Sequence, residues 1–152
     1  MKLPRVESQS WAGYTIDSGC GRLIRDNYQR NLEQMARFLS AYGVPLMIVL
    51  QPEKNWKQPW WSEEEAQDAQ RVLKDLPWYD RAVRAIYPGL SDAAQRAGAA
   101  FGLHVADLRP VFRDRTETMF VDPVHMNDRG NEIVAQALAG YVMPVLPRAA
   151  SR

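Results

Sequence analysis

The stretch VPLMIVLQP, residues 44–52, decides the fold class of this chain. It is a continuous apolar run without alternation of polar and apolar side chains, and Pro52 ends it. Such a run is typical of a strand buried on both faces, as in a parallel sheet between layers of helices. We therefore expect an α/β fold whose sheet contains this stretch.

The residues before this strand have the pattern of a βαβ unit. The spacing of apolar residues predicts a helix that starts at Arg22, and Gly43 is placed to end it. Its apolar stripe consists of Leu23, Tyr28, Leu32, Met35, Phe38, Leu39 and Tyr42. A helix, a glycine and a buried strand in this order form half of a βαβ unit.

The middle of the chain indicates three helical segments and a second strand. The first helix begins at a capping box formed by Ser62 and Glu65. Residues 78–87 form a second, short helical piece, and residues 90–102 a third that is rich in small residues. The stretch LHVADL, residues 103–108, follows directly as the second strand candidate. This order predicts parallel strands joined by right-handed crossovers.

Two strands are fewer than a sheet buried on both faces needs, because an isolated pair is marginally stable in water. Either the N-terminal segment supplies a further strand, or the chain is the later part of a larger fold. In the second case we expect an uncovered strand edge and self-association.

Charge and composition restrict the class of partner. The chain has 19 basic and 18 acidic side chains without a basic stripe, which argues against a nucleic-acid-binding face. Its single cysteine, Cys20, cannot form an internal disulfide and is interpreted as a small hydrophobic residue. We find no signal peptide and no apolar run long enough to cross a bilayer, so the compartment stays open, with the cytoplasm as the default.

The stretch FVDPVHMNDRGNE, residues 120–132, holds the candidate catalytic residues. Asp122 and His125 are three residues apart, so the carboxylate can accept a hydrogen bond from an imidazole nitrogen. That bond would fix the histidine tautomer and leave the other nitrogen aimed at a nucleophile. Asn127 or Asp128 can cap the amphipathic helix that follows. The alternative is an ordinary Asp-Pro turn with a solvated histidine.

This part of the chain resembles the SGNH, or GDSL-type, hydrolase superfamily. The matching stretch is VADLRPVFRDRTETMFVDPVHMNDRGNEIVAQAL, in which a strand ends in Asp and F-x-D-x-x-H precedes a small-residue helix. The upstream stretch NYQRNLEQMARFLSAYGVPLMIVLQP is similar to the helix and strand before that block. The resemblance covers roughly residues 22–142.

The resemblance implies a three-layer α/β/α, flavodoxin-like fold with a parallel sheet, and serine-dependent hydrolysis of a small-molecule or carbohydrate ester. It implies that His125 is the general base and that Asp122 orients it, and it implies no metal or organic cofactor. We assign residues 22–146 to the C-terminal part of such a domain. Residues 1–21 would form an irregular segment, and residues 147–152 a disordered tail.

The nucleophile of that family is not evident in this chain. The family's serine lies in a G-D-S motif, and a G-x-N-D motif contributes to its oxyanion hole, but the sequence contains neither. Of the seven serines, only Ser18, in YTIDSGCG, is similar to an Asp-Ser-Gly elbow. The alternative is that Ser18 lies in an irregular turn. We therefore expect that the chain begins partway through an SGNH domain and has little esterase activity alone.

Two other constellations remain open. Asp122, His125 and Asp128 could together hold a metal ion, although no second histidine or cysteine lies near them in the sequence. We interpret His104 as a half-buried strand residue. Four tryptophans could form an acyl- or sugar-binding wall or could seal a core: Trp56, Trp60, Trp61 and Trp78. A non-catalytic module that binds carbohydrate or another protein is the alternative to an enzyme.

Overall fold

The structure, a computed structural model, describes residues 19–145 of the chain. This part is mostly helical and contains a small two-stranded parallel sheet. Its elements in chain order are α1 (Gly19–Ala41), β1 (Met47–Leu50), the 3-10 helix η2 (Lys54–Lys57), α2 (Glu63–Asp75), α3 (Tyr79–Phe101), β2 (His104–Asp107), the 3-10 helix η3 (Arg109–Phe112), α4 (Asp128–Val142) and the 3-10 helix η4 (Met143–Val145).

The two strands pair in parallel, as the order of the elements predicts. Met47 lies opposite His104 and Leu50 lies opposite Asp107. The backbone N–H of Leu108 donates to the carbonyl of Leu50 at 3.0 Å, which continues the pairing beyond the strand ends. Both strands therefore leave the sheet together at its carboxyl end, where η2 and η3 follow.

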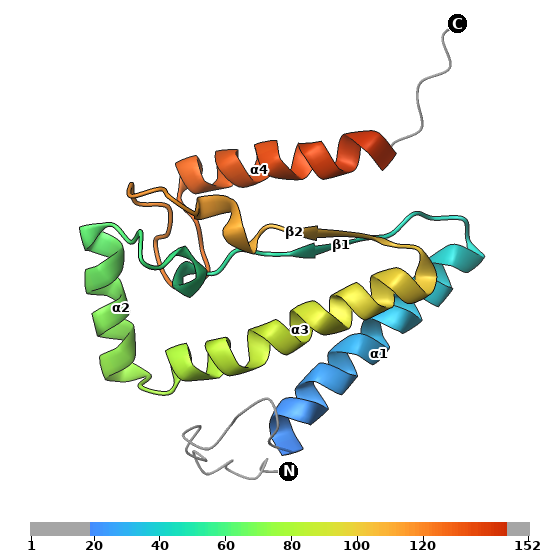
Figure 1. Ribbon diagram of the computed structural model, residues 1–152, viewed down its shortest axis with the longest axis horizontal. Coiled ribbons are helices and arrows are strands. Elements are labelled where there is room, and N and C mark those ends of the chain that lie inside the picture. Colours follow the sequence, from blue (N-terminus) through green and yellow to red (C-terminus); the bar gives the residue numbers. More distant parts are fainter. Residues whose placement is uncertain (1–18, 146–152) are drawn as a thin grey trace, which may run out of the picture.

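The sheet lies between helices on both sides (Figure 1). Helices α1 and α3 lie on one side, and α4 runs along the other. On the first side Ile48 and Leu50 pack in a buried cluster with Leu32 of α1 and with Ala94 and Ala97 of α3. This cluster fixes both helices to the sheet.

A second core lies beneath α4. It consists of the buried side chains of Phe112, Met119, Phe120 and Ile133. The rings of Phe112 and Phe120 meet edge to face, with centroids 5.2 Å apart. Because Met119 and Phe120 lie just before the predicted site, this core packs that segment against α4.

The sequence predicts that the first strand is buried on both faces, and this is wrong for one face. Ile48 and Leu50 are buried, but Val49, which points to the other face, is 40% exposed. The reason is the position of α4, which contacts β2 and η3 and leaves the neighbouring face of β1 partly open.

Residues 78–87 and 90–102 do not form two separate helical pieces. They belong to the single helix α3, which continues through Pro88 and Gly89 and ends at Phe101. A proline inside a helix costs about 3 kcal/mol or more, through a lost hydrogen bond and a clash with the preceding turn. The packing of α3 against α1 and the sheet offsets that cost through a row of buried small residues: Ala82, Gly89, Ser91, Ala93, Ala94, Ala97 and Gly98.

The helix ends agree closely with the sequence. Helix α1 begins at Gly19 instead of Arg22, so residues 19–21 are helical and not irregular. The capping box of α2 is confirmed, since Ser62 Oγ accepts from the Glu65 N–H at 3.1 Å and Glu65 Oε2 accepts from the Ser62 N–H at 2.9 Å.

No helix in the described part of the chain is long and apolar enough to cross a bilayer.

Gly98 marks a close approach between α3 and β2. An added Cβ would lie 2.5 Å from Val105 Cγ2 and 3.3 Å from the carbonyl oxygen of Leu103. We expect Gly98→Ala to lower the free energy of unfolding by about 1–3 kcal/mol in urea titrations, because overpacking outweighs the helix propensity of alanine. Gly140→Ala in α4 is the matched control, since its Cβ would meet no atom within 4 Å. Stabilisation of both variants by the same amount would contradict the close α3–β2 contact.

Candidate functional site

Asp122 and His125 are in direct contact, as their spacing predicts. Asp122 Oδ2 lies 2.6 Å from His125 Nδ1. The second carboxylate oxygen, Oδ1, accepts from the backbone N–H groups of Val124 at 2.8 Å and of His125 at 2.7 Å. The imidazole is 75% exposed, and its Nε2 has no hydrogen-bond partner among residues 19–145. The pair thus has the arrangement of an oriented base with one nitrogen free.

The hydrogen bonds to Asp122 also set its acidity. Burial raises the pKa of this carboxyl, but the N–H groups of His125 and Val124 and the imidazole together outweigh burial and hold the pKa below its ordinary value. Asp122 is therefore an anion across the neutral range, as an orienting carboxylate must be.

The loop that carries the pair is closed by backbone hydrogen bonds. Phe120 and Met126 form an antiparallel bridge, and the Val121 N–H donates to the carbonyl of His125 at 2.9 Å. Asn127 then begins α4, because its side chain accepts from the Gly130 N–H at 2.8 Å. Gly130 has no room for a side chain, since a Cβ would lie 2.7 Å from the carbonyl oxygen of Met119.

A buried ion pair fixes the segment that leads into this loop. Lys57 and Glu65 form a salt bridge whose side chains are both inaccessible to solvent. Glu65 Oε1 accepts from the backbone N–H groups of Met119 at 2.8 Å and Phe120 at 3.0 Å. Lys57 Nζ donates to the carbonyl of Glu117 at 2.8 Å. The pair therefore ties η2 and α2 to the chain just before Asp122.

The loop is also fixed to the end of β1. The Lys54 N–H donates to the carbonyl of Pro123 at 3.0 Å, and Gln51 Nε2 donates to that of Val124 at 3.1 Å. The Asp122–His125 pair consequently lies at the carboxyl end of the parallel strands. Ligands of open α/β sheets bind at this end.

A groove of about 430 Å³ opens beside His125, between the exposed face of β1 and α4. Its apolar lining comes from Val49, Pro52, Leu108, Val124, Met126, Val134 and Leu138. The polar lining residues are Gln51, His125 and Asn131, and the amides of Gln51 and Asn131 donate to backbone carbonyls of the loop. None of these described lining residues is a serine, threonine or cysteine.

The other predicted site residues do not join this pair. Ser18 lies outside the described residues. Ser62 caps α2, and Ser91 is buried and accepts from Arg109 Nη2 at 2.8 Å. Within residues 19–145 no three His, Cys, Asp or Glu side chains lie close enough to hold a metal ion, so Asp128 does not complete a cluster with Asp122 and His125.

The prediction that His104 is half-buried is wrong. It is the first residue of β2 and is exposed, because α3 and α4 cover the strand only from Val105 onward. His104 therefore lies at the amino end of the strand, opposite to the end that carries the Asp122–His125 pair.

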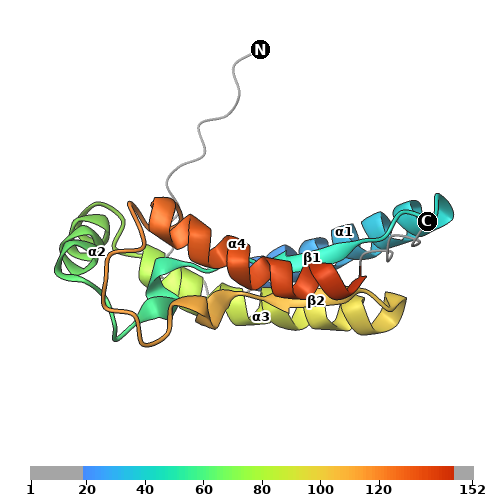
Figure 2. The same cartoon turned by 90° about the horizontal axis from the view of Figure 1, so that it is seen from above.

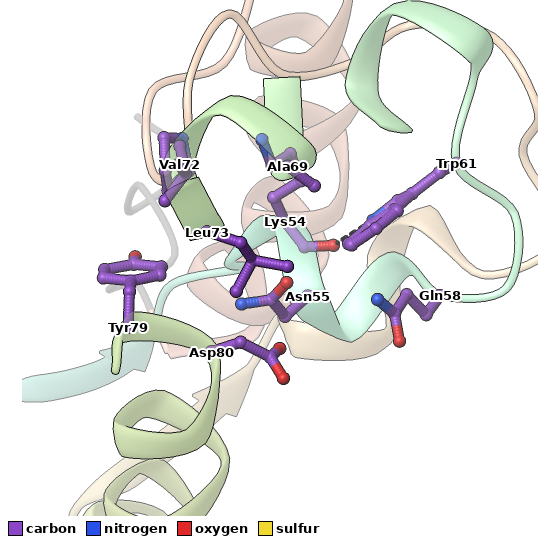
Figure 3. A pocket seen from close by; sticks show the side chains of 10 residues that line it. Lys54, Asn55, Gln58, Trp61, Ala69, Val72, Leu73, Tyr79 and Asp80 are labelled. Atoms are coloured by element: carbon purple, nitrogen blue, oxygen red, sulfur yellow. Dashed lines mark hydrogen bonds between the residues drawn. The ribbon is translucent and has the colours of Figure 1, made fainter. Parts of the chain in front are cut away.

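The four tryptophans are all partly buried. Trp56 lies between the guanidinium of Arg109, 5.2 Å from a ring centroid, and the ring of Tyr87, 6.1 Å away. Trp61 donates from Nε1 to the carbonyl of Lys54 at 2.7 Å (Figure 3). These contacts favour the interpretation that the tryptophans seal the packing around η2.

A second, smaller pocket of about 100 Å³ lies among η2, α2 and the start of α3 (Figure 3). Its charged lining residues already have partners, since Lys54 pairs with Asp68 and Asp80 pairs with Arg84. The other lining residues are mixed, with apolar Ala69, Val72 and Leu73 and polar Asn55, Gln58 and Tyr79. The Tyr79 hydroxyl donates to Glu53 Oε1 at 3.4 Å, and none of the described lining residues is a histidine, serine, threonine or cysteine.

The sequence did not reveal the role of the segment EKNWK, residues 53–57, which it presents as part of a loop. Glu53, Lys54 and Lys57 are all buried there. The Lys54 N–H and Lys57 Nζ donate to carbonyls of Pro123 and Glu117, in and just before the site loop. The available signal is weak: two lysines three residues apart precede a helix that begins with three glutamates.

We expect Glu65→Ala to lower the free energy of unfolding by on the order of 3–5 kcal/mol, because it leaves the Lys57 ammonium buried without a carboxylate. It also leaves the N–H groups of Met119 and Phe120 unpaired. Glu63→Ala, at an exposed position two residues earlier, is the control and should change stability by less than about 1 kcal/mol. Chemical denaturation measures both, and equal effects would contradict the anchoring role of Glu65.

Glu53 makes stability depend on pH. Its side chain is buried, and burial raises its pKa from 4.5 to about 7 against the opposing effects of the Asn55 N–H, the Tyr79 hydroxyl and Lys54. A raised folded-state pKa contributes stability that is complete below about pH 4.5 and is lost as pH rises through about 7. We therefore compare the free energy of unfolding of the unsubstituted protein with that of Glu53→Gln at each pH. The first value minus the second should fall by on the order of 3 kcal/mol between pH 4 and pH 8. A difference that stays flat or grows with pH would refute this assignment.

Comparison with known proteins gives no match: no family model, no curated protein and no solved structure is significantly similar to the chain.

Proposed function

We propose that Asp122 and His125 are the orienting carboxylate and general base of an ester hydrolase with the three-layer, flavodoxin-like architecture of the SGNH superfamily. The observation that carries the proposal is the 2.6 Å contact between Asp122 Oδ2 and His125 Nδ1, with Nε2 unpartnered within the described residues. The position of the pair at the carboxyl end of the strands supports it.

The chemistry follows from this arrangement. The Nδ1–H donates to the Asp122 anion, so Nε2 carries the lone pair and can accept a proton. As a hydroxyl nucleophile attacks the ester carbonyl carbon, its proton passes to Nε2, and the imidazolium is stabilised by Asp122. The imidazolium then returns the proton to the leaving alkoxide. The attacking hydroxyl must come from outside the described residues that line the groove.

The groove restricts the substrate. Seven of its ten lining residues are apolar, counting Pro52, so it suits an apolar acyl or alkyl group better than a charged one. A volume of about 430 Å³ is that of a small-molecule site. We therefore propose a small ester with its apolar part in the groove and its carbonyl beside His125.

The second candidate function is a non-catalytic module that binds carbohydrate or another protein chain with the same surface. It is favoured by the lack of a hydroxyl or thiol side chain among the described residues of the groove. Under that reading the Asp122–His125 contact stabilises the loop and takes no part in proton transfer.

Hydrolysis of p-nitrophenyl acetate by the full chain tests the proposal. We expect a low rate above the uncatalysed reaction, since an oriented imidazole acts on activated esters without a serine. His125→Ala should remove nearly all of that excess rate, and Asp122→Asn a smaller part of it, because orientation is secondary to proton transfer. His104→Ala is the matched control, because it removes the other of the two histidines, also exposed, and should leave the rate unchanged.

Equal rates for the unmodified chain and His125→Ala would sink the enzyme proposal and favour the binding module. Losses of the same size from His125→Ala and His104→Ala would mean that any exposed imidazole suffices and that the site is not specific. Circular dichroism of each variant shows whether the fold is retained.

A further inference from the structure

The outer edge of β1 is open. The sheet contains β1 and β2 alone within residues 19–145, so one edge of β1 has no strand partner there. Edge strands in natural proteins usually carry a charge, a proline or a bulge that prevents pairing with another chain. The four residues of β1, MIVL, include no charged residue and no proline. Among the described residues, nothing pairs with this edge of β1 and no charge or proline protects it.

An uncharged stripe runs along α1 next to this edge. Asn31, Met35, Phe38 and Tyr42 are spaced i, i+4, i+7 and i+11, which places them on one face of the helix. All four are exposed, and the rings of Phe38 and Tyr42 are in contact with centroids 5.0 Å apart. We call these residues the α1 stripe. Exposed helix faces normally carry charge, and this one carries none.

The α1 stripe and the free edge face the same side of the molecule. The opposite flank of α1 packs on α3, where Gln29 Oε1 accepts from Arg96 Nη2 at 3.0 Å and the Arg37 guanidinium lies 5.2 Å from the ring centroid of Phe101. Leu32, between the two flanks, packs against the sheet. Figure 2 shows α1 on the β1 side of the molecule and α3 on the β2 side.

We infer that a second copy of this chain docks along the free edge of β1, with strand pairing to strand and the α1 stripe packing on its equivalent. A two-fold axis beside β1 makes the two β1 strands antiparallel neighbours and joins the two sheets into one of four strands. The N–H and C=O groups on the outer edges of the two β1 strands then bond to each other, and the α1 stripe is buried against its equivalent.

The surface favours this occupant over a single extended peptide. A peptide strand would pair with the edge but leave the α1 stripe exposed, whereas a second copy brings both a strand and a matching helix face. Neither β1 nor the α1 stripe has a charged side chain, so neither of them brings like charges together across the two-fold axis.

Sedimentation velocity of the full 152-residue chain over about 1–100 μM tests the inference. We expect reversible dimerisation, and Phe38→Glu should raise the dissociation constant at least about tenfold. Leu23→Glu is the matched control: both residues lie on α1, and Leu23 is 60% exposed against 63% for Phe38. Leu23 lies four turns away and on the face opposite Leu32, so the control should leave the dissociation constant nearly unchanged.

Hydrogen exchange gives the second measurement, because it reports on the strand edge and not on the helix. The backbone amides of Met47 and Val49, which alternate with the amides that face β2, should exchange more slowly as concentration rises through the dissociation constant. A chain that stays monomeric at every concentration would overturn the inference, and slow exchange at Met47 and Val49 in that monomer would place another segment of the same chain on the edge. Dimerisation that Phe38→Glu and Leu23→Glu weaken equally, or that leaves these amides unprotected, would also overturn it.

Discussion

The buried carboxylate of Glu65 is the interaction on which the site depends. Removing a charge from water is costly unless every lone pair finds a donor, and this carboxylate accepts from Lys57 Nζ and from three backbone N–H groups. The backbone donors lie at the start of α2 and at Met119 and Phe120. One side chain thus connects η2, α2 and the segment before Asp122. The segment that leads into the candidate pair is therefore fixed by contacts other than the one between Asp122 and His125.

These backbone and buried contacts explain how an exposed pair can keep a defined geometry. An ion pair or hydrogen bond between solvent-exposed side chains is worth about 1 kcal/mol or less, which is too little to position a catalytic base. Asp122 is held by two backbone N–H groups, and the loop around it is closed by the bridge between Phe120 and Met126. Backbone hydrogen bonds therefore fix Asp122, and Asp122 in turn orients the imidazole, whose Nε2 stays accessible to a substrate.

The sequence predicts the parts of this structure that local physics decides. The capping box at Ser62 and Glu65 and the contact of Asp122 with His125 are encoded within short stretches, and the parallel order of the strands follows from the helices between them. The second role of Glu65 is not, because its partners Met119 and Phe120 lie more than fifty residues along the chain. Tertiary packing likewise decides the continuity of α3 through Pro88, where a local rule predicts a break.

The groove at His125 is a consequence of the placement of α4. A single helix covers about the width of two strands, and α4 lies over β2 and η3 instead of being centred on the sheet. Val49 is consequently left without a covering helix, and the space above it is the groove. The α1 stripe lies on the other side of the sheet, so a partner that packs on the stripe and pairs with β1 need not fill the space above Val49. The same uncovered strand can therefore serve an interface at its edge and a ligand on its face.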